Sequence, residues 1–242
     1  MKVAAYLSGF APDSGGGYTF ENDVFEGLIA AIAAGTTSHQ WCAICPQPAA
    51  EAVKRRLSGL PVDVHVVLPS RLDRVLKPIV REQALVRAHW RRASPLDRAA
   101  IEADADFIWF LGAGAELTDT SYMTVVWDLQ HRATPWFPEM AARGMWDHRE
   151  LWHSWFLRRA SIVITGTETG QAELDRYYQV GPERVAILPH PTPQFALDAV
   201  ASKGRAAIER LGLGERPYLL YPAQFWPHKN HVNLILAIEQ LR

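Results

Sequence analysis

A glycine-rich segment, Ser14 to Thr19 (SGGGYT), joins an apolar run, Val3 to Leu7, to a helical pattern over Val24 to Ala34. Ligands of open α/β sheets bind outside the carboxyl ends of the strands, where this segment would lie. Gly16 and Gly17 have no Cβ, so their N–H groups can approach a phosphate or a sugar hydroxyl, and the positive end of the next helix favours an anion. The segment matches neither G-x-G-x-x-G nor a P-loop with its lysine, which leaves a plain flexible loop as the alternative.

Asp128 and His131 follow another apolar run, Met123 to Trp127, which is a predicted strand. They should therefore lie at the carboxyl edge of the same sheet. A carboxylate and an imidazole at this spacing can share a site, where one orients the other or polarises a hydroxyl. The stretch that follows, Pro135 to Glu139 (PWFPE), would add a rigid aromatic wall of the kind that sugar and ring substrates need. The alternative is an Asp that caps a helix and a solvated His.

Lys229 lies in a third junction, Tyr221 to His231 (YPAQFWPHKNH), just before a predicted helix over His231 to Leu241. A cation at a helix N-terminus opposes the helix dipole, which is unfavourable unless an anion is bound. This conflict favours a phosphate partner, and a plain surface lysine is the alternative. His228 and His231 have the spacing of a metal-binding pair, but no third ligand is near them in the sequence, so we expect no metal.

Seven short apolar runs alternate with longer helical patterns, which predicts an α/β fold with a Rossmann-like parallel sheet and helices on both faces. The expected strands are Val3–Leu7, Trp41–Ile44, Val62–Leu68, Asp106–Leu111, Met123–Trp127, Ser161–Thr165 and Arg184–Leu188. The helical patterns after the first cover 48–58, 70–92, 95–103, 146–159 and 168–178.

The character of the sequence changes after Leu188. Three prolines in LPHPTP (188–193) cannot sit inside a helix or a central strand, which indicates a stiff connector. A further predicted strand, Pro217 to Tyr221, and the helix after it could not bury their apolar faces alone, so we expect the natural protein to continue. The predicted parts are a domain over 1–190, an interdomain linker over 191–216 and the truncated start of a C-terminal domain over 217–242.

The composition excludes several classes of protein. Hydrophobic residues make up 48% of the 242 positions and there are only two Cys, which excludes wholesale disorder and a disulfide scaffold. A formal charge of −1 disfavours a nucleic-acid binder. No run approaches about 18 apolar residues and the start, MKVAAYLSGF, makes no signal peptide, so we expect a cytoplasmic protein. Cys42 and Cys45 should take opposite faces of one strand, which predicts structural thiols.

The segment 70–98 is basic, with eight Lys and Arg residues against three acidic ones. Arg74, Lys77 and Arg81 recur at helical spacing beside apolar residues, although Pro78 should interrupt or kink the helix. Such a basic amphipathic segment suits peripheral contact with an anionic membrane or an anionic acceptor. The alternative is an ordinary solvated face with buried tryptophans. The residues that would add interfacial anchors are Trp146, Trp152, Trp155, Phe156, Arg158 and Arg159.

Taken in order, four segments resemble the GT-B glycosyltransferases of family 4. They are SGGGYT (14–19), VVWDLQHRATPWFPEM (125–140), ITGTETGQAELDRYYQVGPERVAILPHPTP (164–193) and YPAQFWPHKNH (221–231). The resemblance implies a hexosyl-type glycosyltransferase that moves a sugar from a nucleotide diphosphate sugar, its co-substrate, to a saccharide or lipid-linked acceptor. It further implies retention of configuration, no metal or other cofactor, and polysaccharide biosynthesis in the cytoplasm, with peripheral contact at the inner face of the membrane.

On this resemblance, 1–190 is the acceptor-side domain and 217–242 opens the nucleotide-sugar-binding domain. The donor-domain motif of two Glu residues is absent, so we expect the chain to lack most of the donor site and to be inactive alone. Trp127 stands where many relatives have His before Asp, which removes one expected contact to the donor sugar. The implied roles are catalytic for Asp128 and His131, donor-binding for Gly16, Gly17 and Lys229, and acceptor-side for Tyr18, Trp127 and Arg132.

Two alternatives remain open. One is a non-catalytic domain that binds an acceptor or partner and needs a separate donor domain. The other is a different GT-B enzyme of nucleotide sugars, such as an epimerase. A dehydrogenase is disfavoured because G-x-G-x-x-G is missing, and we expect no nucleic-acid partner.

Overall fold

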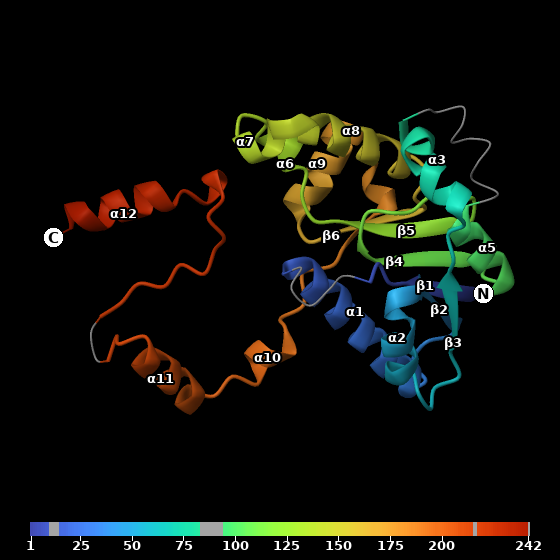
Figure 1. The fold of residues 1–242 in the computed structure, drawn as a ribbon, viewed down its shortest axis with the longest axis horizontal. Helices are drawn as coiled ribbons and strands as arrows, with labels where there is room; N and C mark the ends of the chain where they lie inside the picture. Colours follow the sequence, from blue (N-terminus) through green and yellow to red (C-terminus); the bar gives the residue numbers. More distant parts are fainter. Residues whose placement is uncertain (10–14, 83–93, 215–216, 242) are drawn as a thin grey trace. The chain divides into compact units, whose positions relative to one another are not determined.

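The computed structural model describes residues 1–9, 15–82, 94–214 and 217–241 (Figure 1). These residues form two compact units. The first unit comprises Met1–Leu129 and Arg149–Pro191, and the second unit comprises Gln130–His148 and Thr192–Arg242. The domain boundaries predicted from the sequence stay a prediction.

The first unit is built on a seven-stranded sheet in the order β3-β2-β1-β4-β5-β6-β7, and every neighbouring pair is parallel. All seven strands predicted from apolar runs are confirmed. From β1 the chain moves outward to β3, then returns to β4 on the other side of β1, so the sheet has a topological switch point between β1 and β4. The strands are β1 (Lys2–Tyr6), β2 (Gln40–Pro46), β3 (Asp63–Val67), β4 (Phe107–Ala113), β5 (Ser121–Val126), β6 (Ile162–Thr165) and β7 (Val185–Ile187).

Helices cover both faces of this sheet (Figure 1), as the apolar strands require. Cys42 packs into the cluster on one face and Cys45 into the cluster on the other, which confirms the predicted opposite orientation of the two thiols. One face carries α1 (Gly16–Ala33) and α2 (Ala50–Arg56), and the other carries α5 (Pro95–Glu102), α8 (Met145–Phe156) and α9 (Glu168–Tyr178).

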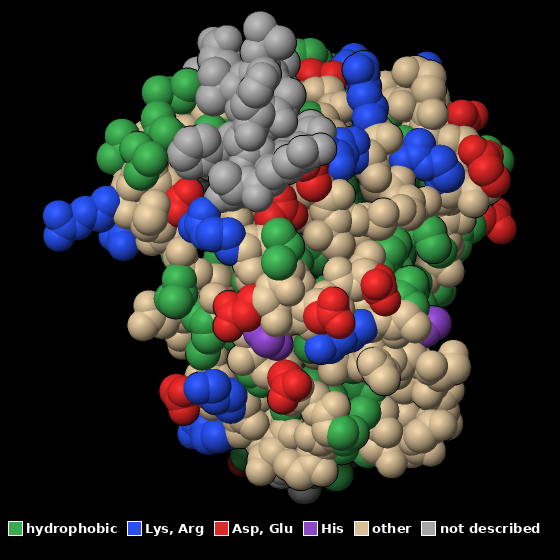
Figure 2. Space-filling view, turned by 90° about the vertical axis from the view of Figure 1, so that its right-hand side faces the viewer, with side chains coloured by type: hydrophobic (Ala, Val, Ile, Leu, Met, Phe, Trp, Pro, Cys, Tyr) green, Lys and Arg blue, Asp and Glu red, His purple; other side chains and the backbone are tan. Residues whose placement is uncertain are grey.

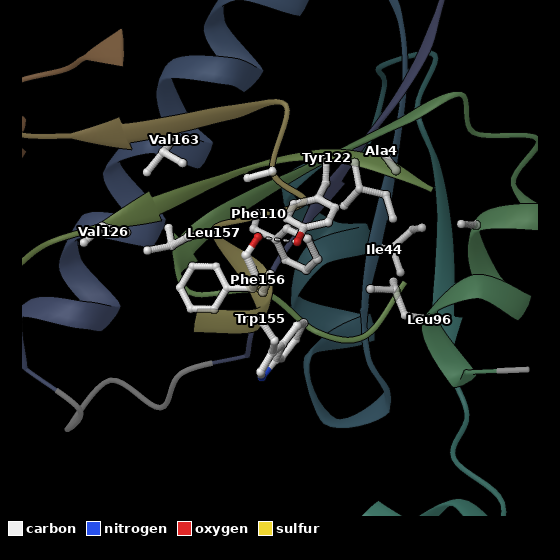
Figure 3. Packing of buried hydrophobic residues seen from close by; sticks show 14 of the residues in the cluster. Ala4, Ile44, Leu96, Phe110, Tyr122, Val126, Trp155, Phe156, Leu157 and Val163 are labelled. Atoms are coloured by element: carbon white, nitrogen blue, oxygen red, sulfur yellow. Dashed lines mark hydrogen bonds between the residues drawn. The ribbon is translucent and has the colours of Figure 1, made fainter. Parts of the chain in front are cut away.

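The core beneath α5, α8 and α9 is mainly apolar with one polar tie (Figure 3). Tyr122 is 2% exposed, and its hydroxyl donates to the backbone oxygen of Phe156 at 2.6 Å. Burying a large apolar side chain contributes about 2 to 3 kcal/mol, and the hydrogen bond removes the cost of burying the hydroxyl. Tyr122 therefore fixes the end of α8 against β5.

α3 (Arg71–Glu82) continues through Pro78 as one helix, so a predicted interruption at this residue is wrong, and a kink there stays a prediction. Asp73 and Val80, on either side of the proline, are both buried, and this packing holds the two halves in one helix. The rest of the predicted helical pattern, 83–92, lies outside the described residues. No helix among the residues that the structure describes is long and apolar enough to cross a bilayer.

The regular elements in the described part of the second unit are all helices or 3-10 turns. The predicted strand over Pro217 to Tyr221 is wrong, because 217–226 form no regular element and no described segment offers them a ladder partner. The predicted helix after it is confirmed as α12 (His231–Gln240). The other elements are α6 (Gln130–Ala133), α7 (Pro138–Ala141), the 3-10 turns Ala142–Gly144 and Pro227–Lys229, α10 (Gln194–Leu197) and α11 (Ala201–Arg210).

Candidate functional site

A cavity opens at the carboxyl ends of β1 and β4, beside the switch point of the sheet. We call it the switch-point cavity; its volume is about 350 Å³. A smaller cavity of about 90 Å³ has four lining residues in common with the switch-point cavity. Parallel sheets of this order bind ligands at this place, since the neighbouring loops diverge there. The shared lining residues are Tyr6, Ser8, Glu116 and Trp152.

The N-terminus of α1 lies open to solvent after β1. Gly15 precedes the helix with φ of 71°, and Gly16 is its first residue. A Cβ placed on either glycine would meet no atom within 4 Å, so there is room for a ligand against the backbone. The first turn holds no acidic residue, and the N-cap makes no side-chain hydrogen bond. These features favour an anion there, although Ser14 itself lies outside the described residues.

Phe20 links this helix end to the end of β5. It lies one turn after Gly16, and its ring centroid is 5.8 Å from that of Trp127 and 5.1 Å from that of His190. Phe20 therefore packs the first turn of α1 against the end of β5 within the first unit. In the sequence, His190 carries no signal of this contact beyond its place between two prolines in LPHPTP.

Asp128 and His131 have different surroundings. Asp128 is exposed directly after β5, as predicted, and pairs with Arg149 at 3.4 Å. His131 belongs to the second unit and is fully buried, with its ring 6.5 Å from that of Trp146. The alternative of a solvated His is therefore wrong, while joint action of these two residues stays a prediction. Arg132 places its guanidinium 5.3 Å from the Trp146 ring.

The polar side of the cavities comes from residues that the sequence analysis did not select. Glu21 on α1 is 2% exposed and accepts hydrogen bonds from the Ser8 N–H at 2.9 Å and the Ser8 hydroxyl at 2.5 Å. Burial raises the pKa of Glu21, and the hydrogen bonds from Ser8 act against this. Burial raises the pKa of Tyr6, and the negative charges of Glu116 and Glu21 raise it further. The Tyr6 hydroxyl therefore keeps its proton and can donate a hydrogen bond.

Two tryptophans of α8 form the aromatic side of the switch-point cavity. Trp152 and Trp155 lie with their rings 5.3 Å apart, and Trp155 is 9% exposed. For Trp155 this confirms the alternative of a buried tryptophan over an interfacial anchor. Gly114 has φ of +87°, and a Cβ there would meet Trp152 Nε1 at 2.9 Å, so only glycine leaves room for this indole.

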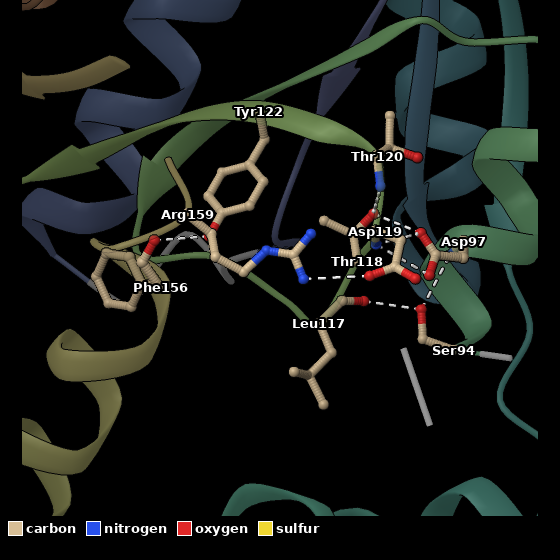
Figure 4. A network of polar contacts seen from close by, with 9 residues as sticks. All are labelled: Ser94, Asp97, Leu117, Thr118, Asp119, Thr120, Tyr122, Phe156 and Arg159. Atoms are coloured by element: carbon tan, nitrogen blue, oxygen red, sulfur yellow. Dashed lines mark hydrogen bonds and ion pairs between the residues drawn. The ribbon is translucent and has the colours of Figure 1, made fainter. Parts of the chain in front are cut away.

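A polar network holds the opposite wall in place (Figure 4). Ser94 caps α5 by accepting from the Asp97 N–H at 3.0 Å, and its hydroxyl donates to the Leu117 oxygen at 2.7 Å. Asp97 accepts from the Thr118 hydroxyl at 2.5 Å and from the Asp119 N–H at 2.9 Å. Burial raises the pKa of Asp97, although these hydrogen bonds oppose the shift. The loop between β4 and β5 is therefore tied to the start of α5.

Lys229 lies in the second unit, exposed in the turn just before α12, as predicted. Asn230 follows it with φ of 56°, and the Tyr221 hydroxyl donates to the Lys229 backbone oxygen at 2.9 Å. The neighbouring residue, His228, contacts the Glu139 carboxylate through its backbone N–H at 3.0 Å and through Nδ1 at 2.6 Å. This pair fixes the backbone beside Lys229.

Charged side chains of both signs lie together on the face in Figure 2, and the described residues contain no group of metal ligands. Figure 2 shows Lys and Arg side chains interspersed with Asp and Glu on the face it presents, together with hydrophobic side chains. Within the described ranges, no three His, Cys, Asp or Glu side chains come together in a group that could hold a metal ion.

Comparisons with known proteins show a similar fold in a solved structure but no match in sequence. No family model matches the chain, and no curated protein matches it in sequence. A glycosyltransferase structure from Rickettsia africae ESF-5 matches with a TM-score of 0.56 at 11% identity, over 100% of this chain and 57% of that chain. Anabaena Alr3699/HepE in complex with UDP and glucose matches with a TM-score of 0.48 at 14% identity, over 99% of this chain and 58% of that chain. The chain thus shares the fold of the Rickettsia glycosyltransferase and spans 57% of its length.

Proposed function

We propose that this chain is part of a glycosyltransferase that moves a sugar from a nucleotide diphosphate sugar to a saccharide or lipid-linked acceptor. One observation carries the proposal: an open, glycine-bordered helix N-terminus lies at the carboxyl edge of the sheet, in the unit that also holds the switch-point cavity. The fold that this chain shares with a glycosyltransferase structure supports the proposal. The resemblance of four segments to family 4 supports the finer assignment to that family and to a hexosyl-type, retaining reaction.

The main catalytic demand in this reaction is negative charge on the leaving diphosphate. Donors placed in advance where charge develops lower the barrier most. Here Lys229 and the N–H groups of Gly16 and Gly17 are the candidate donors, and they would act without a metal or other cofactor. Lys229 is exposed just before α12, where a cation is unfavourable unless an anion binds beside it, and this position supports a role in binding the diphosphate.

The roles of the remaining site residues are proposed from the chemistry of their side chains. Asp128 and His131 would position the acceptor hydroxyl or the donor sugar. Trp127, held by Phe20, would provide an apolar wall where relatives use His. Tyr18 and Arg132 would complete the acceptor side.

Peripheral membrane contact would use α3. Leu72, Val75 and Ile79 recur at helical spacing and are 59%, 70% and 46% exposed, with Arg71 and Arg74 beside them. An apolar strip flanked by cations suits an anionic lipid surface. Sedimentation with anionic vesicles at low and high salt tests it, and absence of binding at low salt would contradict it.

The function is tested by incubating the whole protein with a panel of nucleotide diphosphate sugars and acceptors. A glycoside product is expected, whereas an epimerised nucleotide sugar would indicate the epimerase alternative. Acceptor binding without any transfer would indicate a non-catalytic binding domain.

Lys229→Ala should lower kcat/KM for the donor at least about 100-fold, the scale measured for loss of one charge-stabilising donor. Lys54→Ala is the control, because Lys54 pairs with Glu51 on the exposed side of α2. Equal activity of the two variants would remove Lys229 from the donor site.

A further inference from the structure

Glu21 is a buried carboxylate beside the carboxyl end of β1. It lies on α1, the helix that begins at Gly16, and is 2% exposed. Burial raises the pKa of Glu21, which reflects the cost of removing a carboxylate from water, and hydrogen bonds from Ser8 and from the Gly9 backbone offset part of this cost. A side chain that only packed α1 against the sheet would need no ionisable group, so the carboxylate is explained by the donors that it binds.

Ser8 and Gly9 follow β1, and we call these two residues the β1 exit. From α1, the Glu21 carboxylate accepts from the Ser8 N–H at 2.9 Å and from the Ser8 hydroxyl at 2.5 Å. From β2, Pro46 packs against the backbone of Gly9, which has φ of +73°, and a Cβ at Gly9 would lie 2.9 Å from Pro46 Cγ. The carboxylate and the proline therefore hold the β1 exit from two sides.

The β1 exit borders the proposed site. Ser8 lines both cavities, and Pro46 lines the switch-point cavity as well. The helix that carries Glu21 is also the helix whose N-terminus, at Gly16, is the proposed donor site. The hydrogen bonds between Glu21 and Ser8 thus fix the end of β1 to the helix that would hold the donor.

We propose that Glu21 is a positioning residue, which acts through Ser8 to hold the end of β1 against α1 and so keeps the donor-binding helix end and the switch-point cavity in a fixed arrangement. This role rests on the proposed glycosyl transfer. With 2% of its surface exposed, Glu21 itself would not touch a substrate. Its effect comes from geometry, because a displacement of about 1 Å in a site can lower a rate about 100-fold.

The first test measures kcat/KM of the whole protein for the donor that the panel of nucleotide diphosphate sugars identifies. Glu21→Ala removes the acceptor from both Ser8 donors and should lower kcat/KM at least about tenfold. Glu21→Gln keeps an acceptor oxygen at the same position and should restore most of this loss.

Gly59→Ala is the control for a loss of stability alone. Gly59 lies between α2 and β3, at the opposite edge of the sheet, and its φ of +85° makes an alanine strained although the Cβ would meet no atom within 4 Å. Gly59→Ala should therefore keep the kcat/KM of the unaltered protein. Equal kcat/KM in Glu21→Ala and Gly59→Ala, or a Glu21→Gln variant as impaired as Glu21→Ala, would overturn the inference.

Ser8→Ala shows whether Glu21 acts through Ser8. Both substitutions remove the hydrogen bond from the Ser8 hydroxyl, so the double variant should lose less kcat/KM than the product of the two single losses. Losses that multiply would mean that Glu21 affects the site independently of Ser8, which contradicts the proposal.

Calorimetric titration of the whole protein with UDP, GDP and ADP separates this inference from the proposed reaction, because nucleotide binding needs no acceptor. For the nucleotide that binds, the affinity of Glu21→Ala should be at least about tenfold lower than that of Gly59→Ala. Transfer by the unaltered protein, together with equal affinity and equal kcat/KM in these two variants, would contradict only this inference. A selective loss of affinity in Glu21→Ala, without any transfer by the unaltered protein, would contradict only the proposed reaction. An unaltered protein that binds none of the three nucleotides and transfers no sugar would contradict both.

Discussion

Glu139 and His228 form a two-point contact in the second unit, although 89 positions separate them in the sequence. One carboxylate oxygen accepts from the His228 backbone N–H at 3.0 Å and lies 2.6 Å from its Nδ1. A carboxylate can only accept, so Nδ1 carries the proton in this arrangement. Because Lys229 is the next residue, the contact ties the position of the proposed diphosphate-binding lysine to α7.

This contact should be sensitive to acid. Burial would raise the pKa of Glu139, but hydrogen bonds from its own backbone N–H and from His228 outweigh burial and hold the pKa below its ordinary 4.5. A lowered folded-state pKa means that the contact stabilises the fold above pH 4.5 and is lost as the pH falls through the lowered value. Unfolding free energy measured from about pH 6 to about pH 2 should therefore fall less steeply in Glu139→Gln than in the unaltered chain.

Glu239→Gln on exposed α12 is the control and should behave as the unaltered chain does. If Glu139→Gln shows the same slope as this control, the His228 contact does not persist in solution.

Glu21 should show the opposite dependence. Burial raises the pKa of Glu21 above its ordinary 4.5, so its contribution to stability is fully present below that value and decreases as the pH rises through the folded-state pKa. Glu21→Gln keeps an acceptor for Ser8 and should flatten the pH dependence of unfolding above pH 4.5. Glu21→Ala leaves both Ser8 donors without this partner and should cost about 1 to 3 kcal/mol at neutral pH. Denaturant titrations measure both effects, and a Gln variant as unstable as the Ala variant would contradict them.

Gly114 and Gly59 give a matched pair for the packing of Trp152. Their φ angles are +87° and +85°, but a Cβ on Gly114 meets Trp152 whereas one on Gly59 meets no atom within 4 Å. Both alanine variants carry the same backbone strain, of about 1 to 3 kcal/mol. Gly114→Ala should lose additional stability and shift the Trp152 fluorescence. Equal losses in the two variants would show that Trp152 does not pack over β4.

The sequence predicts the sheet well because each strand of a covered parallel sheet is a continuous apolar run. The same rule is wrong for Pro217 to Tyr221, since an apolar run becomes a strand only where another strand pairs with it. The positions of Gly16 and Asp128 at the carboxyl edge could be predicted, because Gly16 lies in the connection from β1 to α1 and Asp128 lies two residues after β5. Glu21 could not, because it lies within a helix and becomes part of the cavity lining only through the strand order.

The contact between Glu139 and His228 was also missed. Neither residue carries a local signal of the other, because the contact depends on tertiary structure across 89 positions.

The central claim is that a nucleotide diphosphate sugar lies against the N-terminus of α1, and Gly16→Ala tests it most directly. A Cβ at Gly16 or at Gly27, further along the same helix, meets no protein atom within 4 Å, so neither alanine should destabilise the fold. With the whole protein, the account predicts that Gly16→Ala lowers kcat/KM for the donor at least about tenfold, or about 1.4 kcal/mol, while Gly27→Ala leaves it unchanged. Unaltered kcat/KM in both variants would contradict a donor site at this helix end.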